Sequence, residues 1–445
     1  MGVENSSNEK RKTAVRIAEK STVRCGKQAQ NAKVQLSTFD LPYITFYYNQ
    51  KLLVYKLVGD EFVEFVEKLK GSLCEVIEEY YTVGGRLAQG EEDGVVYVDC
   101  GGLDADVAIG EADDVEVAEL AEGDPPEELM EELVPYTGVM NLEGFTRPLL
   151  AVQFTKLKDG IAVGCAFNHA ILDGNSTWQF MKSWADLTRG DPISARPLLD
   201  RSLARPTRVP LSLPSSPSAH ESADPNPSPP SALRAHVFSF SGPTLLRLKS
   251  SANSSLPAGA KPFSTFQSLA AHSWRCISRA RRLPPDAITV FAVFADCRSR
   301  LRPPLPDSYF GNLIQAVFTG TAVHPLLTSP PEFAAGLLQK AIEAHDDEAI
   351  RSRLEEYESK PKMFYYTDAG VNCVAVGSSP RFRVYEVDFG FGGPERVRSG
   401  RNNKFDGMMY LYPGREGGEG IDVELTLGGE AMDNLEKDGE FLAGV

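Results

Sequence analysis

Residues 148–189 read PLLAVQFTKLKDGIAVGCAFNHAILDGNSTWQFMKSWADLTR, and this stretch decides the fold. Two apolar runs, Pro148–Leu157 and Ile161–Asn168, flank an Asp-Gly pair at Asp159 and Gly160. An Asp-Gly pair between such runs is typical of a β-hairpin turn. Apolar residues then recur at helical spacing, at Trp178, Met181, Trp184, Ala185 and Leu187. The stretch therefore predicts two paired strands followed by an amphipathic helix.

The junction between the second strand and this helix carries candidate chemistry. His169 ends the strand, and Asp173 and Gly174 follow in the turn. A neutral imidazole, with a pKa of about 6.5, accepts a proton from a hydroxyl at pH 7 when it is well positioned. Asp173 either orients this ring or anchors the turn elsewhere. Taken alone, the spacing favours a structural role for the pair, because such pairs are frequent by chance.

Outside this stretch, strands and helices alternate in both halves of the chain, which predicts two α/β layers. The polar residues 1–33 lack an apolar period and are expected to form a flexible tail. Residues 206–230 contain eight prolines and six serines, so no helix or central strand can run through them. The chain then divides after the tail into an N-terminal domain, a crossover and a C-terminal domain, at residues 34–200, 201–235 and 236–445.

Periodicity predicts the remaining elements. Helices are expected over residues 61–81, 245–252, 266–277 and 333–350. Strands are expected over residues 34–39, 95–98, 236–240, 288–295, 313–318, 383–388, 407–412 and 421–427.

Charge and composition exclude several classes of protein. The chain has 445 residues, of which 42% are hydrophobic and 24% charged, as in ordinary globular proteins. The net charge of −15 comes almost entirely from Asp104–Glu132, which holds 13 acidic residues and no basic one. We read that segment as a solvated acidic stretch, and it argues against a nucleic-acid partner.

The cysteines and the N-terminus indicate the cellular setting. Seven cysteines are scattered without any CxxC or CxxH spacing, which argues against structural zinc and for reduced thiols. Cys165 alternates with apolar residues and is expected to be a packed core thiol rather than a nucleophile. No apolar signal segment and no membrane-spanning run is present, so a protein of the cytosol is expected. We also expect a monomer.

Other short motifs exclude reactions rather than suggest them. Asp388-Phe-Gly390 resembles the metal-binding triplet of protein kinases, but the other kinase motifs are missing. Gly414–Gly420 lacks the end of a phosphate loop and is better explained as a wide turn. No dinucleotide-binding fingerprint, serine-hydrolase elbow or zinc-protease motif occurs. The arginines at 275–282 form a small basic cluster, either for an anionic ligand or as a solvated helix end.

The combination of motifs is more specific than any one of them. His169 to Gly174, the proline-rich crossover, Asp296-Cys-Arg298, Tyr309–Asn312 and Asp388-Phe-Gly-Phe-Gly392 follow in one order. That order resembles the plant BAHD acyltransferases, with their HxxxD and DFGWG motifs, over residues 34–445. Longer matches to the defective-in-cuticular-ridges type, whose second motif also reads DFGFG, lie at residues 41–50, 263–275, 371–392 and 402–412.

This resemblance implies a fold and a reaction. The fold would be two chloramphenicol-acetyltransferase-like α/β domains of mixed sheets and flanking helices, with a channel at their interface. Acyl-CoA would be a co-substrate, with no permanently bound cofactor and no metal, and a hydroxylated acceptor would enter from the opposite side. His169 would be the general base, without a covalent enzyme intermediate. Asp173 would point away from the site and pair with Arg298.

The resemblance also implies supporting roles. Gly174 would let its loop pass close to the ligand, and the Asp388, Gly390 and Gly392 loop would be chiefly structural. Phe391 replaces the usual tryptophan of that motif and, with Arg381, is a candidate for lining the donor or acceptor channel. Arg381 lies near the position where shikimate-using relatives carry an acceptor-binding arginine, although Arg383 is equally close and a structural ion pair explains both.

The subtype implies a role in cutin formation, with a hydroxylated long-chain fatty acid or its glyceryl ester as one substrate. Three alternatives stay open at this point. The chain could transfer a hydroxycinnamoyl group to a small phenolic or shikimate-like acceptor, use the same scaffold for lyase-type chemistry, or bind ligands without catalysis. An intact His169 and Asp173 argue against the inert protein.

Overall fold

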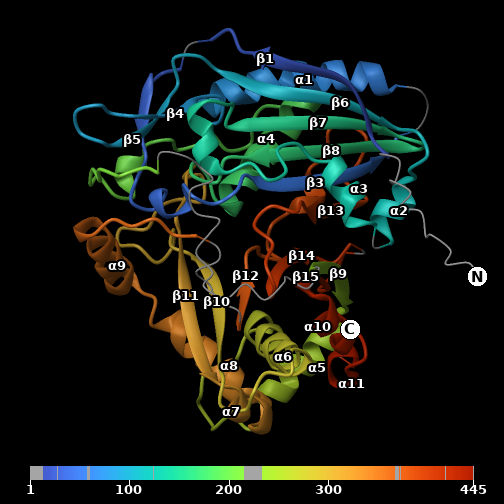
Figure 1. The fold of residues 1–445 in the computed structure, drawn as a ribbon, viewed down its shortest axis with the longest axis vertical. Coiled ribbons are helices and arrows are strands. Elements are labelled where there is room, and N and C mark those ends of the chain that lie inside the picture. The colour runs from blue at the N-terminus through green and yellow to red at the C-terminus, as the bar shows by residue number, and fades with distance from the viewer. Residues whose placement is uncertain are drawn as a thin grey trace, which may run out of the picture.

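The computed structural model describes residues 14–27, 29–57, 61–123, 125–214, 233–365, 370, 372–415 and 417–443. Two six-stranded mixed sheets dominate the molecule, each with its own helices, and the β3–β13 edge of the first sheet lies toward the second (Figure 1). A small three-stranded sheet lies beside the first of them. The predicted class, two α/β units of mixed sheets and flanking helices, is confirmed.

The first sheet has the strand order β1-β6-β7-β8-β3-β13. Its β6 and β7 are parallel, and the other neighbours are antiparallel. The bounds are β1 Arg16–Arg24, β3 Asn49–Lys56, β6 Asp104–Ala112, β7 Leu150–Leu157, β8 Gly160–Phe167 and β13 Arg396–Ser399. The small sheet pairs β2 Lys33–Gln35, β5 Val96–Asp99 and β4 Arg86–Gln89.

Two long helices, α1 Phe62–Glu79 and α4 Gly174–Arg189, pack on one face of this sheet because each buries one apolar stripe (Figure 1). The stripe of α4 includes Trp178, Met181 and Trp184, as the sequence predicts. Short helices α2 Val117–Ala121 and α3 Glu127–Glu132 lie on the other side, where a smaller apolar cluster forms. Short 3-10 helices span Leu41–Tyr43, Tyr81–Val83, Asn141–Phe145 and Arg201–Leu203.

The second sheet has the order β11-β10-β12-β14-β15-β9. Its bounds are β9 Leu233–Phe240, β10 Ile288–Asp296, β11 Ile314–Ala322, β12 Cys373–Val376, β14 Met408–Pro413 and β15 Ile421–Gly428. Its helices are α5 Gly242–Asn253, α6 Thr265–Ala280, α7 Val323–Thr328, α8 Pro331–Glu343, α9 Asp347–Ser359, α10 Gly429–Leu435 and α11 Gly439–Leu442. None of the helices in the described residues combines the length and apolarity needed to cross a membrane.

The N-terminal segment differs from the expected flexible tail. β1 pairs with β6 along its whole length and forms the edge of the first sheet. Its side chains are nearly all exposed, so backbone hydrogen bonds rather than apolar burial hold it, and no alternating pattern marks it in the sequence. The prediction is therefore wrong for this strand, while residues 1–13 lie outside the described residues.

The acidic stretch is also more ordered than a solvated segment. Its first part is β6, an interior strand of the first sheet, in which Ala105, Val107 and Ala112 are buried. The acidic Asp104, Asp106 and Glu111 alternate with these buried side chains and keep partial exposure. This segment forms a strand because acidic side chains alternate with buried apolar ones, and the total number of acidic residues does not prevent it.

The boundary of the C-terminal domain is crossed by one strand. β13 follows the DFGFG motif in sequence, yet it pairs with β3 at the edge of the first sheet. The predicted unit 236–445 is therefore not a separate spatial body. Most of the predicted crossover, residues 215–232, lies outside the described residues, and β9 begins within it at Leu233.

Two predicted elements take other forms. Residues 383–388 form no strand but include a 3-10 helix at Val384–Glu386, because Val384 and Val387 are buried three residues apart. The predicted helix over 333–350 divides into α8 and α9. A new helix starts after Asp346, because the Asp346 side chain accepts a hydrogen bond from the Ala349 N–H and caps α9.

Candidate functional site

His169 lies just beyond the end of β8, where the two units meet. Its N–H donates to Asn141 Oδ1 (2.9 Å) in the first unit, and its carbonyl accepts from Asn312 Nδ2 (2.9 Å) in the second. The backbone of His169 is thus fixed from both sides of the interface. The residue keeps part of its surface exposed, whereas its neighbours Asn168 and Ala170 are fully buried.

The imidazole is held by stacking and by its polar surroundings. The ring of Tyr43 stacks on it with centroids 4.9 Å apart and an interplanar angle of 14°. Tyr43 is itself tied to the second unit, because its hydroxyl donates to the Ile314 carbonyl (3.3 Å). His169 Nδ1 and Asn312 Oδ1 are both buried without a hydrogen-bond partner in the described residues.

Burial lowers the pKa of His169 below its ordinary value, because a charged imidazolium loses hydration there. The ammonium group of Lys51 lowers that pKa further, while the carboxylate of Asp173 acts in the opposite direction. The net direction is downward. The ring is therefore neutral at pH 7 and able to accept a proton.

Asp173 is fully buried and turns toward the second unit. Its Oδ2 accepts from Arg298 Nη1 (2.8 Å) and from the Leu313 N–H (3.0 Å). Its Oδ1 accepts from Arg298 Nη2 (3.1 Å) and from the Ser176 N–H (2.9 Å), which caps α4. Burial by itself would raise the pKa of Asp173, but the Arg298 guanidinium brings it below its ordinary value. A bidentate, buried ion pair therefore joins the two units directly behind the His169 loop.

A second buried ion pair supports the same loop. Arg201 Nη1 donates to Asp40 Oδ1 (2.6 Å), and Arg201 Nη2 donates to the Ile171 carbonyl (2.6 Å). Asp40 Oδ1 also accepts from Asn312 Nδ2 (3.1 Å). Asn312 thus connects this pair to the carbonyl of His169, so the loop is held by charge pairs on both of its sides.

Gly174 lies against the second unit. A Cβ atom at this position would lie 2.9 Å from the ring of Phe382, which is too close for a carbon contact. A larger residue at this position would therefore force the end of the Phe382 ring to shift. Phe382 belongs to the loop that carries Arg381 and Arg383, whose side chains are exposed.

These two arginines are far more solvated than His169. Arg383 forms an ion pair with Glu386 three residues on (3.5 Å), in which both side chains are largely exposed. Such surface pairs contribute little to stability. An acceptor-binding role for Arg381 stays a prediction.

The DFGFG segment forms a tight loop packed on the first unit. Asp388 Oδ1 accepts from the N–H groups of Gly390 (2.7 Å) and Gly392 (2.9 Å). The two glycines have φ values of 110° and 92°, which only glycine adopts readily. The ring of Phe391 contacts Tyr55 (4.8 Å between centroids) and Phe65 (5.1 Å). Its described contacts are packing contacts, and its role in a substrate channel stays a prediction.

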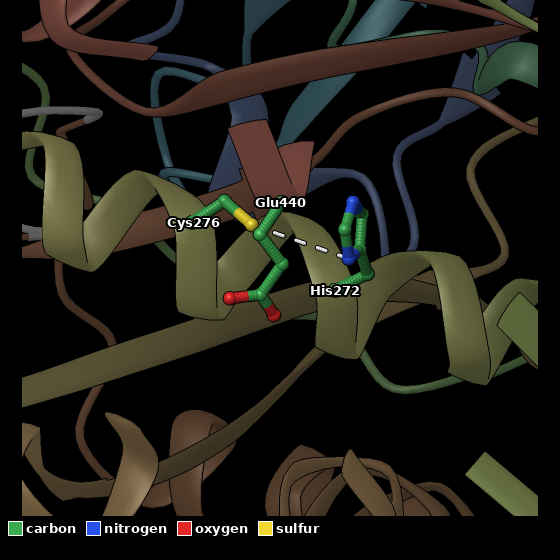
Figure 2. Close-up of side chains that lie close together, drawn as sticks. All are labelled: His272, Cys276 and Glu440. Carbon is green, nitrogen blue, oxygen red and sulfur yellow. Dashed lines mark hydrogen bonds between the residues drawn. The ribbon is translucent and has the colours of Figure 1, made fainter. Parts of the chain in front are cut away.

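One group of potential metal ligands occurs in the described residues, away from the His169 loop. His272 and Cys276 of α6 lie beside Glu440 of α11, and Figure 2 shows the three side chains converging. However, Arg279 donates to Glu440 Oε2 (2.7 Å) and to Cys276 Sγ (3.4 Å). Burial also raises the pKa of Cys276 to about 12, which disfavours the thiolate that a metal requires. We assign no metal to this group.

Sequence reasoning alone did not identify several residues around His169. Asp40, Tyr43 and Asn141 lie far from it in the sequence, and the last two belong to short 3-10 helices that no periodic pattern marks. Asn312 was visible only as part of the Tyr309–Asn312 motif. Which of these residues meet depends on how the two units are placed.

Comparisons with known proteins agree with this arrangement. The model of the Transferase family matches residues 13–442. The BAHD acyltransferase DCR of Arabidopsis thaliana is 52% identical, covering 96% of this chain and 92% of that protein. Hydroxycinnamoyltransferase 2 of Oryza sativa subsp. japonica is 33% identical, covering 83% and 86%.

Solved structures show the same fold. Vinorine synthase aligns with a TM-score of 0.75 at 20% identity, covering 97% of this chain and 98% of that one. TRI101 of F. sporotrichioides, complexed with coenzyme A and T-2, aligns with a TM-score of 0.74 at 20% identity, covering 92% and 98%. From the family match and the 52% identity to DCR, this chain belongs to the BAHD acyltransferases.

Proposed function

We propose that this enzyme transfers an acyl group from acyl-CoA to the hydroxyl of an acceptor, with a hydroxylated long-chain fatty acid or its glyceryl ester as one substrate in cutin formation. The observation that carries the proposal is a neutral imidazole, on a partly buried residue at the interface of two units, beside a carboxylate that is turned away from it. The 52% identity to DCR supports the substrate class, since the sequence resembles the defective-in-cuticular-ridges type. The related fold of TRI101, complexed with coenzyme A, supports the donor.

His169 is the general base in this proposal. The imidazole takes the proton of the acceptor hydroxyl as its oxygen attacks the thioester carbonyl. The tetrahedral intermediate then collapses, the carbon–sulfur bond breaks, and the thiolate of coenzyme A takes the proton back from the imidazolium. No covalent bond to the protein forms, and the products are an ester and free coenzyme A.

Asp173 and Arg298 position this base rather than act on substrate. Both oxygens of Asp173 are occupied by the second unit and by the cap of α4. The carboxylate therefore acts on the imidazole only through its charge and through the position of the turn. Gly174 and Asn312 complete the support of the same turn.

Release of free coenzyme A thiol tests the proposal. Wild-type enzyme is mixed with a panel of long-chain and hydroxycinnamoyl acyl-CoAs, each with and without an ω-hydroxy fatty acid, a monoacylglycerol carrying a hydroxy acyl chain, or a small phenolic acceptor. We expect acceptor-dependent thiol release with a matching ester found by mass spectrometry. If no thioester is consumed in any pairing, the transferase proposal fails. If the enzyme uses only hydroxycinnamoyl donors with phenolic acceptors, it remains a transferase, but the proposed fatty-acid substrate class is wrong.

The pH dependence of the reaction tests the protonation state of His169. Only the neutral imidazole acts as base, so kcat/KM rises through its pKa and is constant above it. Because burial lowers that pKa, we expect the constant region to extend below pH ~6.5, the ordinary histidine value. Initial rates with saturating donor across the acid range measure this. A rise centred above that value would contradict a buried neutral base.

A further inference from the structure

Cys25 and Cys74 bring two sulfur atoms together at the N-terminal edge of the first sheet. Cys25 directly follows β1, and Cys74 lies on α1, which runs beside β1 (Figure 1). Their Sγ atoms are 2.7 Å apart, although the two residues lie 49 positions apart in the sequence. All seven cysteines of the chain are described and carry free thiols, and only these two keep part of their surface exposed. An oxidant in solution therefore reaches this pair before any other thiol.

The segment around Cys25 is docked on the start of β6 and on α1. The Cys25 N–H donates to the Leu103 carbonyl (2.9 Å), just before β6 begins. Two residues on, the Lys27 N–H donates to Glu78 Oε1 (3.1 Å), and Lys27 Nζ forms an ion pair with Glu78 Oε2 (2.7 Å). Because Cys74 and Glu78 are four residues apart on α1, they share one face of that helix. The contacts of the neighbouring residues thus hold the two thiols together.

A disulfide between these cysteines needs little movement. Bonded sulfur atoms lie about 2.05 Å apart, so the gap of 2.7 Å closes with a shift of less than ~1 Å. A bond at this place has a mechanical consequence, because the side chains of β1 are nearly all exposed and backbone hydrogen bonds to β6, rather than apolar burial, hold the strand. A covalent link would anchor the end of this edge strand to a helix that packs on the core.

We infer that Cys25 and Cys74 form a site of reversible oxidation, at which a peroxide produces a disulfide that ties the end of β1 to α1. A dithiol protein of the thioredoxin type would reduce the bond again by thiol–disulfide exchange. Neither residue belongs to the His169 loop, so the inference does not depend on the proposed function.

The oxidation balances with one peroxide and two thiols. Burial and the Glu78 carboxylate raise the pKa of both thiols, so the reaction is slow at pH 7. Cys74 ionises first, because the S–H of Cys25 opposes the rise at Cys74, whereas Cys74 raises the pKa of Cys25 further. The Cys74 thiolate attacks one peroxide oxygen and becomes a sulfenic acid as one water leaves. The Cys25 sulfur then displaces a second water, so the two thiols lose two electrons and two protons to the peroxide.

The test counts thiols in the full-length enzyme before and after treatment with hydrogen peroxide. After denaturation and alkylation, mass spectrometry should find seven alkylated cysteines in untreated protein and five in treated protein, because one bond consumes two of the seven. Digestion without reductant should give a peptide that joins Cys25 to Cys74, and reduction with thioredoxin should restore all seven thiols. Cys25→Ser and Cys74→Ser should each lack that peptide. Links between other cysteines, or sulfinic acid at this pair without a link, would overturn the site.

Thermal unfolding tests whether the bond ties β1 to α1. Because the bond closes a long loop, oxidised wild-type enzyme should unfold several degrees above the reduced enzyme. The double variant Cys25→Ser/Cys74→Ser is the control, since peroxide can act on it everywhere except at the pair, and its two melting curves should coincide. If this variant does not fold, the loss of the shift when oxidised wild type is reduced again replaces it. A cross-linked wild-type enzyme that melts no later than the reduced one contradicts an anchoring role.

Discussion

Replacing Asp173 by Asn will lower the free energy of unfolding by up to about 3–5 kcal/mol, because the buried Arg298 then loses its bidentate partner and keeps only its ion pair with the half-exposed Asp296 (3.0 Å). The side chain of Arg298 is 1% exposed and that of Asp173 is 0% exposed, so water cannot replace the lost partner. Activity will fall with stability, since the same carboxylate fixes Leu313 and the start of α4 around the His169 turn. Urea unfolding and initial rates on the same preparations measure both effects.

A double-mutant cycle isolates the pair. Arg298→Ala should give a similar loss, and the double variant should lose less than the sum, because each change removes the same interaction. Glu343→Gln, which breaks the exposed pair of Glu343 with Lys261, is the control and should cost less than about 1 kcal/mol. Additive losses for Asp173 and Arg298 would show that they do not stabilise each other.

The local structure around the site was predictable because its signals are short-range. The Asp-Gly turn between β7 and β8 and the apolar stripe of α4 follow from spacing alone. Asp173 caps α4 and also pairs with Arg298. A pattern of residue types does not reveal such a dual use of one side chain.

The arrangement across the interface was not predictable from residue spacing. Asp40 and Arg201 are separated by most of the first unit, and their pairing depends on where the 3-10 helices lie beside the His169 loop. After the DFGFG motif the chain returns from the second unit to the first, where β13 joins the first sheet. Nothing in the composition of β13 indicates this return. Lys51 follows Asn49 and Gln50 at the polar start of β3, and nothing in that pattern predicts that its side chain is buried.

Replacing His169 by Ala will cut kcat by roughly 10²–10⁴-fold, the usual contribution of a positioned general base. Binding of acyl-CoA should change little, since the long pantetheine arm and the nucleotide offer the donor many contacts that do not involve the imidazole. The residual rate should recover partly at higher pH, where more of the acceptor hydroxyl ionises without a base. Single-turnover rates with saturating donor, measured across the alkaline range, test the loss of rate and its partial recovery at higher pH.

Folding should survive this change, which separates a catalytic role from a structural one. The position of residue 169 is fixed by its backbone, through Asn141 and Asn312, and these bonds do not need the imidazole. Residue 169 as a whole is only partly buried, and its Nδ1 has no hydrogen-bond partner in the described residues, so the main loss on removing the ring is its stacking on Tyr43. His324→Ala, at an exposed histidine of α7, is the matched control and should change neither rate nor melting temperature. If the His169 variant melts early but keeps its rate per folded molecule, the imidazole is a packing group, because a general base cannot be removed without slowing proton transfer.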